Sequence, residues 1–374
     1  MENLRIIESF RDVETTEEHH GHTYSVWRAL TIAILGSLCG LENVSKIHQW
    51  STSEQVRKFL KENFAIYSVP SYVWLLELLK LIKPESLSER FTMWVSTILP
   101  ESIKDLTISF DGKTFRSTGN MREYENPLHI LSAHFAEIGL TVSQKTVDVK
   151  SNEIPAMREL LKLIDVKGCM VVADALHCQT ETAKTVINEG GDYLLSVKDN
   201  QKTLKQDIES CIQDAELRKS MDTTTKVENN GGRIEKRTAF STTDIEWLET
   251  RKLWMNMASI GAIRNIFTDS DGKTTEEWHY YISSRPLSAD ELLKYARNEW
   301  SIESMHWLLD VHFREDYSRV RDTNANQNLN IIRKAALNSI RNFKNITKSK
   351  RAFSKIMFEC LLNCNALLPI LNVN

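Results

Sequence analysis

Hydrophobic residues recur every three or four positions over much of the first hundred residues. This spacing is the helical period, and it predicts helices over 24–39, 55–64 and 72–82. A fourth helical segment begins at Pro84, which suits the first turn of a helix. The pattern therefore predicts a compact helical domain over residues 1–100. A DNA-binding domain and a plain helical bundle explain it equally well.

After Pro100 the pattern changes to short runs that are rich in β-branched residues or alternate between apolar and polar positions, as strands do. Five strands are predicted: 106–111, 129–135, 141–149, 168–174 and 192–198. Helical segments at 154–164 and 179–189 follow the third and fourth strands. Three strands, then helix, strand, helix and strand, is the order of a ribonuclease-H-like sheet. The predicted fold class is α/β, a mixed sheet flanked by helices, in which an antiparallel meander is extended by two parallel strands.

Residues 199–285 are irregular and partly β-like, with a turn signal at Asn229-Asn230-Gly231-Gly232, so we interpret them as a β-rich insertion into the sheet domain. Ser288 then begins a strong helical pattern over 289–310. Glu291 stands three residues after Ser288, the spacing of a capping box.

Three parts of the chain follow from these patterns: an N-terminal helical domain, a ribonuclease-H-like domain over 101–345 that carries the insertion, and a helical tail over 346–374. The longest apolar run, 29–39, is too short to span a bilayer. The N-terminus lacks the architecture of a signal peptide. Six scattered cysteines contain no CxxC pair and suggest no disulfide framework or zinc knuckle. We expect a cytoplasmic protein without a membrane partner.

The net charge of −3 argues mildly against a general binder of polyanions, but the charge is unevenly distributed. The segment 318–355 contains ten Lys or Arg residues and one acid, Asp322. Such a basic stripe can neutralise DNA phosphates even in an acidic protein. A solvated C-terminal helix is an equally good explanation of the stripe by itself.

Two aspartates stand at equivalent ends of strands that we expect to be neighbours in the sheet. Asp111 ends the first predicted strand and precedes Gly112, where the chain can turn and a substrate can approach; Asp174 ends the fourth predicted strand. Each alone is more often a turn residue than a catalytic one. Together, their carboxylates are expected to converge.

The helix over 289–310 supplies a third acid. Glu299, Glu303, His306 and Asp310 fall at helical spacings on one broad face, which is too polar for a core stripe. A surface helix with paired charges remains the alternative. Glu303 is preferred over Glu299 because Trp300 and Ile302 flank it as packing anchors.

Clustered carboxylates on rigid elements are what phosphodiester chemistry with Mg²⁺ needs, since Mg²⁺ prefers hard oxygen ligands. Two such ions, about 4 Å apart, can activate an attacking oxygen and stabilise a leaving one. Asp111, Asp174 and Glu303 are therefore the candidate catalytic and metal-ligating residues, with two Mg²⁺ as cofactors and Mn²⁺ as a substitute.

At this point the residues resemble the H-repeat-associated, Rhs-linked insertion-sequence transposases of the DDE superfamily. The resemblance covers nearly the whole chain, and its colinear blocks include ISFDGKTFRSTG, HILSAHFAEIGL, VVADALHCQTETAKTVINEGGDYLLSVKDNQKTL, GGRIEKR and WSIESMHWLLDVHFREDYSRVR. It implies that Asp111, Asp174 and Glu303 are the DDE triad.

The resemblance also implies contacts with the DNA backbone. The candidate DNA-binding residues come from a K-x-N-Q motif, a GRIE-x-R block, the segment after Asp111, the Glu303 helix and the basic stripe. They are Lys113, Arg116, Lys198, Asn200, Gln201, Arg233, Arg237, His306, Arg319 and Arg321. Three positions depart from the family pattern without removing a metal ligand: Glu299 where a basic residue or His is usual, Gly231 where His is common, and His177 where a small residue is commoner.

The predicted function is that of a DNA transposase, which hydrolyses a strand at the element's end and transfers the 3′-hydroxyl to target DNA. Its expected partners are double-stranded DNA and a second copy of the chain, and its expected location is the bacterial nucleoid. Two alternatives stay open. A structure-selective nuclease on the same fold would cut without joining, and a silent DNA-binding remnant would do neither.

Overall fold

A computed structural model of the chain describes residues 5–16, 24–115, 127–147, 152–230, 233–318 and 320–372. Its centre is a nine-stranded sheet in the order β3-β2-β1-β4-β5-β9-β8-β7-β6. The first five strands are β1 (Thr107–Thr114), β2 (His129–Phe135), β3 (Leu140–Thr146), β4 (Met170–Ala173) and β5 (Asp192–Val197). β2 pairs antiparallel with β1 and β3, and β4 pairs parallel with β1 and β5. The predicted mixed sheet is confirmed.

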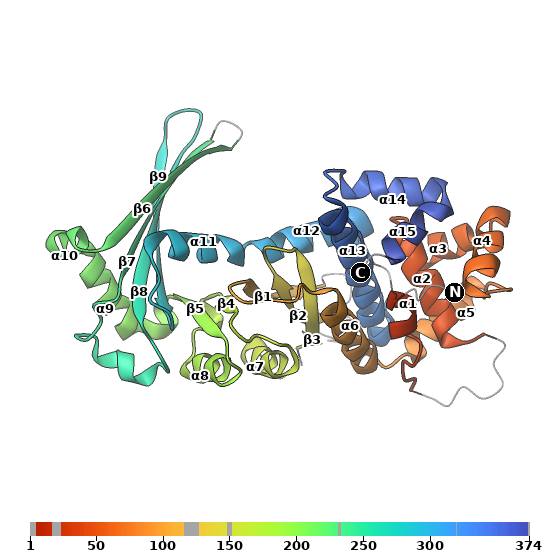
Figure 1. Cartoon of the computed structure of the whole chain (residues 1–374), viewed down its shortest axis with the longest axis horizontal. Helices are drawn as coiled ribbons and strands as arrows, with labels where there is room; N and C mark the ends of the chain where they lie inside the picture. Colours follow the sequence, from red (N-terminus) through yellow and green to blue (C-terminus); the bar gives the residue numbers. More distant parts are fainter. Residues whose placement is uncertain are drawn as a thin grey trace.

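The segment expected to be irregular is instead a regular antiparallel extension of the same sheet. It comprises β6 (Asp222–Asn230), β7 (Arg233–Thr242), β8 (Ser259–Thr268) and β9 (Thr274–Ser283), preceded by α9 (Lys202–Gln213) and α10 (Ala215–Lys219). β9 pairs antiparallel with β5, which joins the extension to the first five strands. Figure 1 shows the far ends of these hairpins standing away from the helices.

Helices lie on both faces of the sheet (Figure 1). On one face lie α7 (Glu153–Leu163) and α8 (Thr180–Asn188), and on the other lie α11 (Ala289–Glu299) and α12 (Ser301–Phe313). The predicted capping box at the start of α11 is confirmed, because the Ser288 hydroxyl accepts from the Glu291 amide at 3.2 Å and the Glu291 carboxylate accepts from the Ser288 amide at 2.9 Å. The single helix predicted over 289–310 is wrong, since Trp300 separates two helices.

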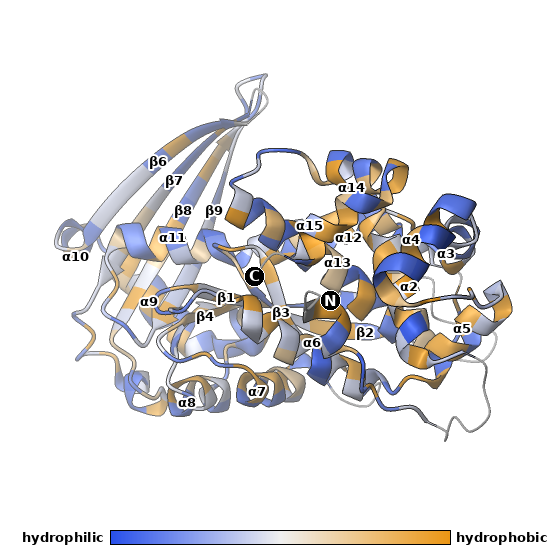
Figure 2. Ribbon diagram, turned by 45° about the vertical axis from the view of Figure 1, so that its right-hand side comes forward, coloured by the Kyte–Doolittle hydropathy of each residue, from blue (hydrophilic) through white to orange (hydrophobic). Residues whose placement is uncertain are grey.

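Helices from the two ends of the chain pack together. The N-terminal ones are α1 (Arg5–Ser9), α2 (Val26–Leu38), α3 (Val44–Ser51), α4 (Glu54–Phe64), α5 (Tyr72–Leu81) and α6 (Pro84–Ile98). The C-terminal ones are α13 (Thr323–Thr347), α14 (Phe353–Leu362) and α15 (Leu367–Leu371). The long α13 contacts α2, α5 and α6 on one side and β3 on another. One hydrophobic core therefore continues from these helices into the sheet, and apolar residues gather where they meet (Figure 2). Among the described residues, no helix combines the length and apolar character needed to cross a bilayer.

Candidate active site

The sheet register brings the two candidate aspartates side by side. Phe110 of β1 pairs in parallel with Ala173 of β4, and the next residues are Asp111 and Asp174. Asp174 follows the end of β4, and its carboxylate accepts from the Leu176 amide at 3.1 Å in the short 3₁₀ helix η2 (Ala175–His177). Asp111 does not end its strand as predicted, because β1 continues to Thr114.

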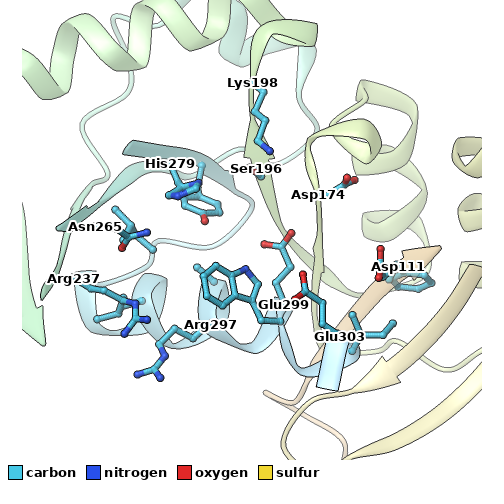
Figure 3. Close-up of a pocket in the computed structure, with 17 residues that line it drawn as sticks. Asp111, Asp174, Ser196, Lys198, Arg237, Asn265, His279, Arg297, Glu299 and Glu303 are labelled. Carbon is cyan, nitrogen blue, oxygen red and sulfur yellow. The ribbon is translucent and has the colours of Figure 1, made fainter. Parts of the chain in front are cut away.

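Helices α11 and α12 bring two glutamates over this edge of the sheet. The side chains of Asp111, Asp174, Glu299 and Glu303 line one pocket of about 260 Å³. Figure 3 shows the four carboxylates turned toward a shared space, with Lys198 at one side of it. The structure thus gathers all three predicted acids, and it adds Glu299, the position that Glu303 was preferred over.

The acids in this pocket outnumber the cations near them. Burial and the negative charges of Asp174, Asp111 and Glu303 raise the pKa of Glu299 to about 7, although the positive charge of Lys198 acts in the opposite direction. Such crowding of like charge raises the free energy of the ionised pocket. The pocket is therefore suited to a cationic ligand.

Ligand-type side chains do not form a closed metal site in this geometry. Among the described residues, no three His, Cys, Asp or Glu side chains are arranged to hold one metal ion together. The four acids surround an open pocket instead, which a substrate group could enter.

His306, a predicted DNA contact, lies beside a candidate ligand. Its Nδ1 is 3.3 Å from the Asp111 Oδ2 atom, and its side chain is only 12% exposed. Its Nε2 atom is buried, with no hydrogen-bond partner among the described residues. The imidazole is thus placed to orient the Asp111 carboxylate.

The K-x-N-Q residues lie next to the loop after Asp174. The Asn200 amide donates to the Ala175 carbonyl at 2.6 Å, and the Gln201 amide donates to the Cys178 carbonyl at 2.9 Å. Both side chains therefore hold the η2 loop, while Lys198 is exposed and lines the pocket.

Lys113, another predicted DNA contact, belongs to a partly buried ion network. Its ammonium lies 2.6 Å from Asp310, 3.4 Å from Glu315 and 3.6 Å from Asp316. Burial alone would lower the pKa of Lys113, but these carboxylates raise it. Arg333 adds a further cation, 3.6 Å from Glu315. The ammonium thus ties β1 to the end of α12.

Gly112, expected to give a substrate room, faces a side-chain cluster instead. A Cβ atom at Gly112 would collide with the Glu153 carboxylate and the His129 ring. The Glu153 carboxylate lies 2.7 Å from the Nε2 atom of His129 and 3.4 Å from the Nε2 atom of His177. Burial opposes the charge of Glu153, but the two histidines lower its pKa to about 2. This cluster joins β2, α7 and the loop after Asp174.

The two arginines of the GRIE-x-R block differ in their surroundings. Arg237 lines the acidic pocket but is only 6% exposed, and it is paired with Glu228 at 2.7 Å and with Glu235. Arg233 is exposed near the hairpin end, where it stacks over the Phe267 ring at 4.2 Å. Arg233 is therefore the arginine of this block that is open to a phosphate.

The basic stripe is not a uniform surface. Arg333 and Lys334 are buried, at 3% and 2% exposure, so two of its cations cannot meet DNA. Arg321 is exposed. Arg116 and Arg319 lie outside the described residues.

Sequence reasoning missed several residues that line the pocket. Trp300, expected to be a packing anchor, is 51% exposed at the pocket, whereas Ile302 is buried as expected. Asn265 of β8 is 4% exposed, and its Oδ1 atom has no hydrogen-bond partner among the described residues. Its one signal in the sequence is a polar residue inside an apolar strand.

Two protein families cover most of the chain. Residues 103–339 match the family described as "Transposase DDE domain", and residues 7–95 match the family described as "DDE_Tnp_1-associated". The chain is 30% identical to the YbfL protein of Escherichia coli K12 over 92% of this chain and 90% of that protein. It is 29% identical to "H repeat-associated putative transposase YhhI" of the same strain, with the same coverage. A solved piggyBac transposase synaptic complex with hairpin DNA aligns at a TM-score of 0.46 and 11% identity, over 98% of this chain and 80% of that chain.

Proposed function

The chain belongs to the DDE transposases, and from that premise we propose that it cuts DNA at the ends of a mobile element and joins the freed 3′-hydroxyl to target DNA. The observation that carries this proposal is the gathering of Asp111, Asp174 and Glu303 in one pocket, from two adjacent strands and a crossing helix. Strand ends and a packed helix hold side chains more rigidly than loops do, as phosphoryl transfer requires.

We expect Asp111, Asp174 and Glu303 to hold a pair of divalent cations. Enzymes of this family use divalent metal ions such as Mg²⁺. Mg²⁺ keeps several waters and is usually held by one or two carboxylates together with substrate phosphates. Three protein ligands on one ion are therefore not required. Asp111, Asp174 and Glu303 would hold the ions, which when bound would activate the attacking oxygen and stabilise the leaving one.

The other side chains of the pocket would orient these ligands and the DNA. His306 would fix the rotamer of the Asp111 carboxylate from a position 3.3 Å away. Asn200 and Gln201 would hold the loop that carries Asp174. Lys198 is exposed at the pocket and would receive a DNA phosphate, as would Arg233 at the hairpin end and Arg321.

Two copies of the chain would act together on DNA. Asp111, Asp174 and Glu303 share a single pocket in each chain, which would process one strand end at a time. An element has two ends, so a homodimer would pair them.

The test is cleavage and joining by Asp111→Asn. The substrate is a duplex carrying the sequence that flanks this gene in its element, incubated with purified protein and Mg²⁺. We expect wild-type protein to nick this DNA and to join a pre-cut 3′-hydroxyl end to a target plasmid, and the variant to do neither. Asp165→Asn removes the same charge before β4, outside the pocket, and serves as the matched control.

Each outcome of this test is decisive. Full Mg²⁺-dependent cleavage by Asp111→Asn would show that the triad assignment is wrong. Cleavage without joining by wild-type protein would identify a nuclease. Binding without either reaction would identify a silent remnant.

A further inference from the structure

A second pocket lies beside the acidic one, on the neighbouring face of α12. Ile302 and Glu303 of this helix line the acidic pocket, while Ser301 and Ser304 line the second one. The second pocket has a volume of about 210 Å³, which is several times the roughly 30 Å³ that a water molecule occupies. The catalytic reaction proposed above makes no use of it.

Arg341 of α13 lines this second pocket, and its charge is not neutralised there. Among the described residues no carboxylate forms an ion pair with it, and its Nε atom is buried without a hydrogen-bond acceptor. The guanidinium carbon lies 4.8 Å from the centre of the Phe353 ring. Burial lowers the pKa of Arg341. A half-buried cation with no anion beside it costs free energy unless a ligand supplies the anion.

The backbone is shaped to admit this guanidinium. Gly139 has a φ of +66°, and a Cβ atom there would lie only 2.8 Å from the Arg341 Nε atom. A side chain at Gly139 would therefore be strained and would also push Arg341 aside. Ser301 and Ser304 of α12 line the same pocket, and their hydroxyls are potential donors to a bound anion.

The surroundings of the pocket are positively charged. Burial and the positive charges of Arg341 and Arg351 lower the pKa of Lys344, which lies 5.4 Å from the Phe353 ring centre. Among the described residues that line the pocket, Glu137 is the one acid. Its carboxylate already accepts hydrogen bonds from Thr107 and from Asn298.

We propose that this pocket binds one phosphate group of the DNA backbone, with the Arg341 guanidinium as its main ligand and Ser301 and Ser304 as hydroxyl donors. The proposal rests on the proposed function, since it assigns a second anchoring point for the DNA that enters the acidic pocket. Arginine suits this role because its planar fork matches the oxygens of a phosphate.

The first test is the salt dependence of DNA binding, measured without divalent metal so that no cleavage occurs. Arg341→Gln should lower the slope of log affinity against log salt concentration by about 0.9, the value for one lost phosphate contact. At low salt its affinity should fall by about tenfold. Arg341→Lys keeps the charge but lacks the planar guanidinium, so its salt slope and its affinity should lie between those of wild type and Arg341→Gln. Lys184→Gln on α8, whose 57% exposed side chain lies outside the pocket, makes the same change in charge and should leave both values near wild type.

The second test separates a lost ligand from a damaged fold. Ser304→Glu places a carboxylate at an exposed position in the wall of the pocket that Arg341 also lines. It should raise the melting temperature, because it supplies the missing anion, and it should weaken DNA binding as strongly as Arg341→Gln does. Inorganic phosphate, compared with chloride of equal ionic strength, should stabilise wild-type protein and neither variant.

The outcomes distinguish this proposal from the proposed function. If wild-type protein binds and cuts DNA while Arg341→Gln has an unchanged salt slope, the phosphate pocket is wrong and the transposase assignment stands. If phosphate stabilises the wild type but the slope is unchanged, the pocket binds a free anion, and its assignment to DNA is overturned. If wild-type protein binds no DNA at all, the proposed function itself fails.

Discussion

Asp111 and Lys113 lie two positions apart on β1, and the charged residues around each of them are organised in opposite ways. Asp111 faces the acidic pocket, where Asp174, Glu299 and Glu303 add negative charge and Lys198 is the cation that acts on Glu299. On the same strand, two residues later, the Lys113 ammonium belongs to a network in which anions and cations alternate.

This difference separates a binding site from a structural one. Glu315 is fully buried, yet Arg333, Lys113 and Lys334 lower its pKa below the ordinary value despite the opposing effect of burial. The pKa of Glu299 is shifted in the opposite direction, because burial and the negative charges around it both raise it. Residues of opposite charge that pair with one another stabilise the fold, whereas unpaired charges of one sign form a site for a ligand of the opposite charge. The two groups should therefore respond oppositely to loss of a single charge.

The largest effect is expected in the acidic pocket and on activity alone. Asp174→Asn should reduce the rate of DNA cleavage by about a thousandfold, which corresponds to about 4 kcal/mol of transition-state stabilisation. Its melting temperature should equal or exceed that of wild type, because one repelling charge is gone. Cleavage assays and thermal unfolding on the same preparation measure both. A lower melting temperature together with normal cleavage would show that Asp174 stabilises the fold and does not serve the reaction.

In the ion network the effect should fall on stability. Glu315→Gln leaves Lys113 and Arg333 without their shared buried anion, which should cost about 3 kcal/mol or more of the free energy of unfolding. Asp316→Asn removes a partly exposed carboxylate of the same network, at 30% exposure, and should cost less than about 1 kcal/mol. Denaturant unfolding measures the two. Equal losses would show that burial of the charge does not decide its contribution.

The Glu153 cluster should stabilise the fold in a defined range of pH. The folded-state pKa of Glu153 is about 2, below its ordinary value of 4.5, so the unfolded chain binds this proton more readily. The stability it contributes is present above pH 4.5 and is lost as the pH falls toward 2. The contribution is about 3 kcal/mol, at about 1.4 kcal/mol for each pKa unit.

Unfolding curves of wild type and Glu153→Gln over this range test the prediction. The stability difference between them should shrink steadily from pH 5 to pH 2. A difference that stays constant with pH would mean that the histidines do not act on a charged Glu153.

Glu299→Gln should change stability in the opposite direction, because the variant is expected to be more stable than wild type. The folded-state pKa of Glu299 is raised to about 7, so its ionisation destabilises the fold above pH 7, and this cost disappears as the pH falls to 4.5. At about 1.4 kcal/mol for each pKa unit, the variant should gain up to about 3 kcal/mol over wild type near pH 8, and the gain should vanish near pH 4.5. Thermal unfolding at the two pH values measures it. A variant that is less stable at pH 8 would contradict the crowding of charge in the pocket.

The sequence predicted the sheet better than its extension. Strands β1 to β5 carry apolar or β-branched runs because both faces of the sheet are covered there, and their order and directions were predicted correctly. In contrast, β9 begins with four exposed residues, so burial imposes no clear periodicity on it. The break at Trp300 was missed because no proline or glycine marks it.

The candidate site also has a part that the sequence predicted and a part that it did not. Adjacent parallel strands bring Asp111 and Asp174 together for reasons that a single sequence contains. The fate of Lys113 could not be predicted in this way, since its partners Asp310 and Glu315 come from the end of α12 and the loop beyond it. Nor could charge counting distinguish the buried Arg333 from the half-buried Arg341, because only packing decides which cations stay accessible.

The most direct test of the central claim is the binding of Mn²⁺ to the protein, measured by calorimetric titration of wild type, Asp111→Asn, Asp174→Asn, Glu303→Gln and Asp165→Asn. We predict that wild type and the Asp165→Asn control bind two ions in the presence of DNA. Each of the other three variants should lose an ion or bind it at least about tenfold more weakly, because the ion loses a carboxylate ligand. Equal stoichiometry and affinity in all five proteins would contradict the assignment of this pocket as the metal centre of a transposase.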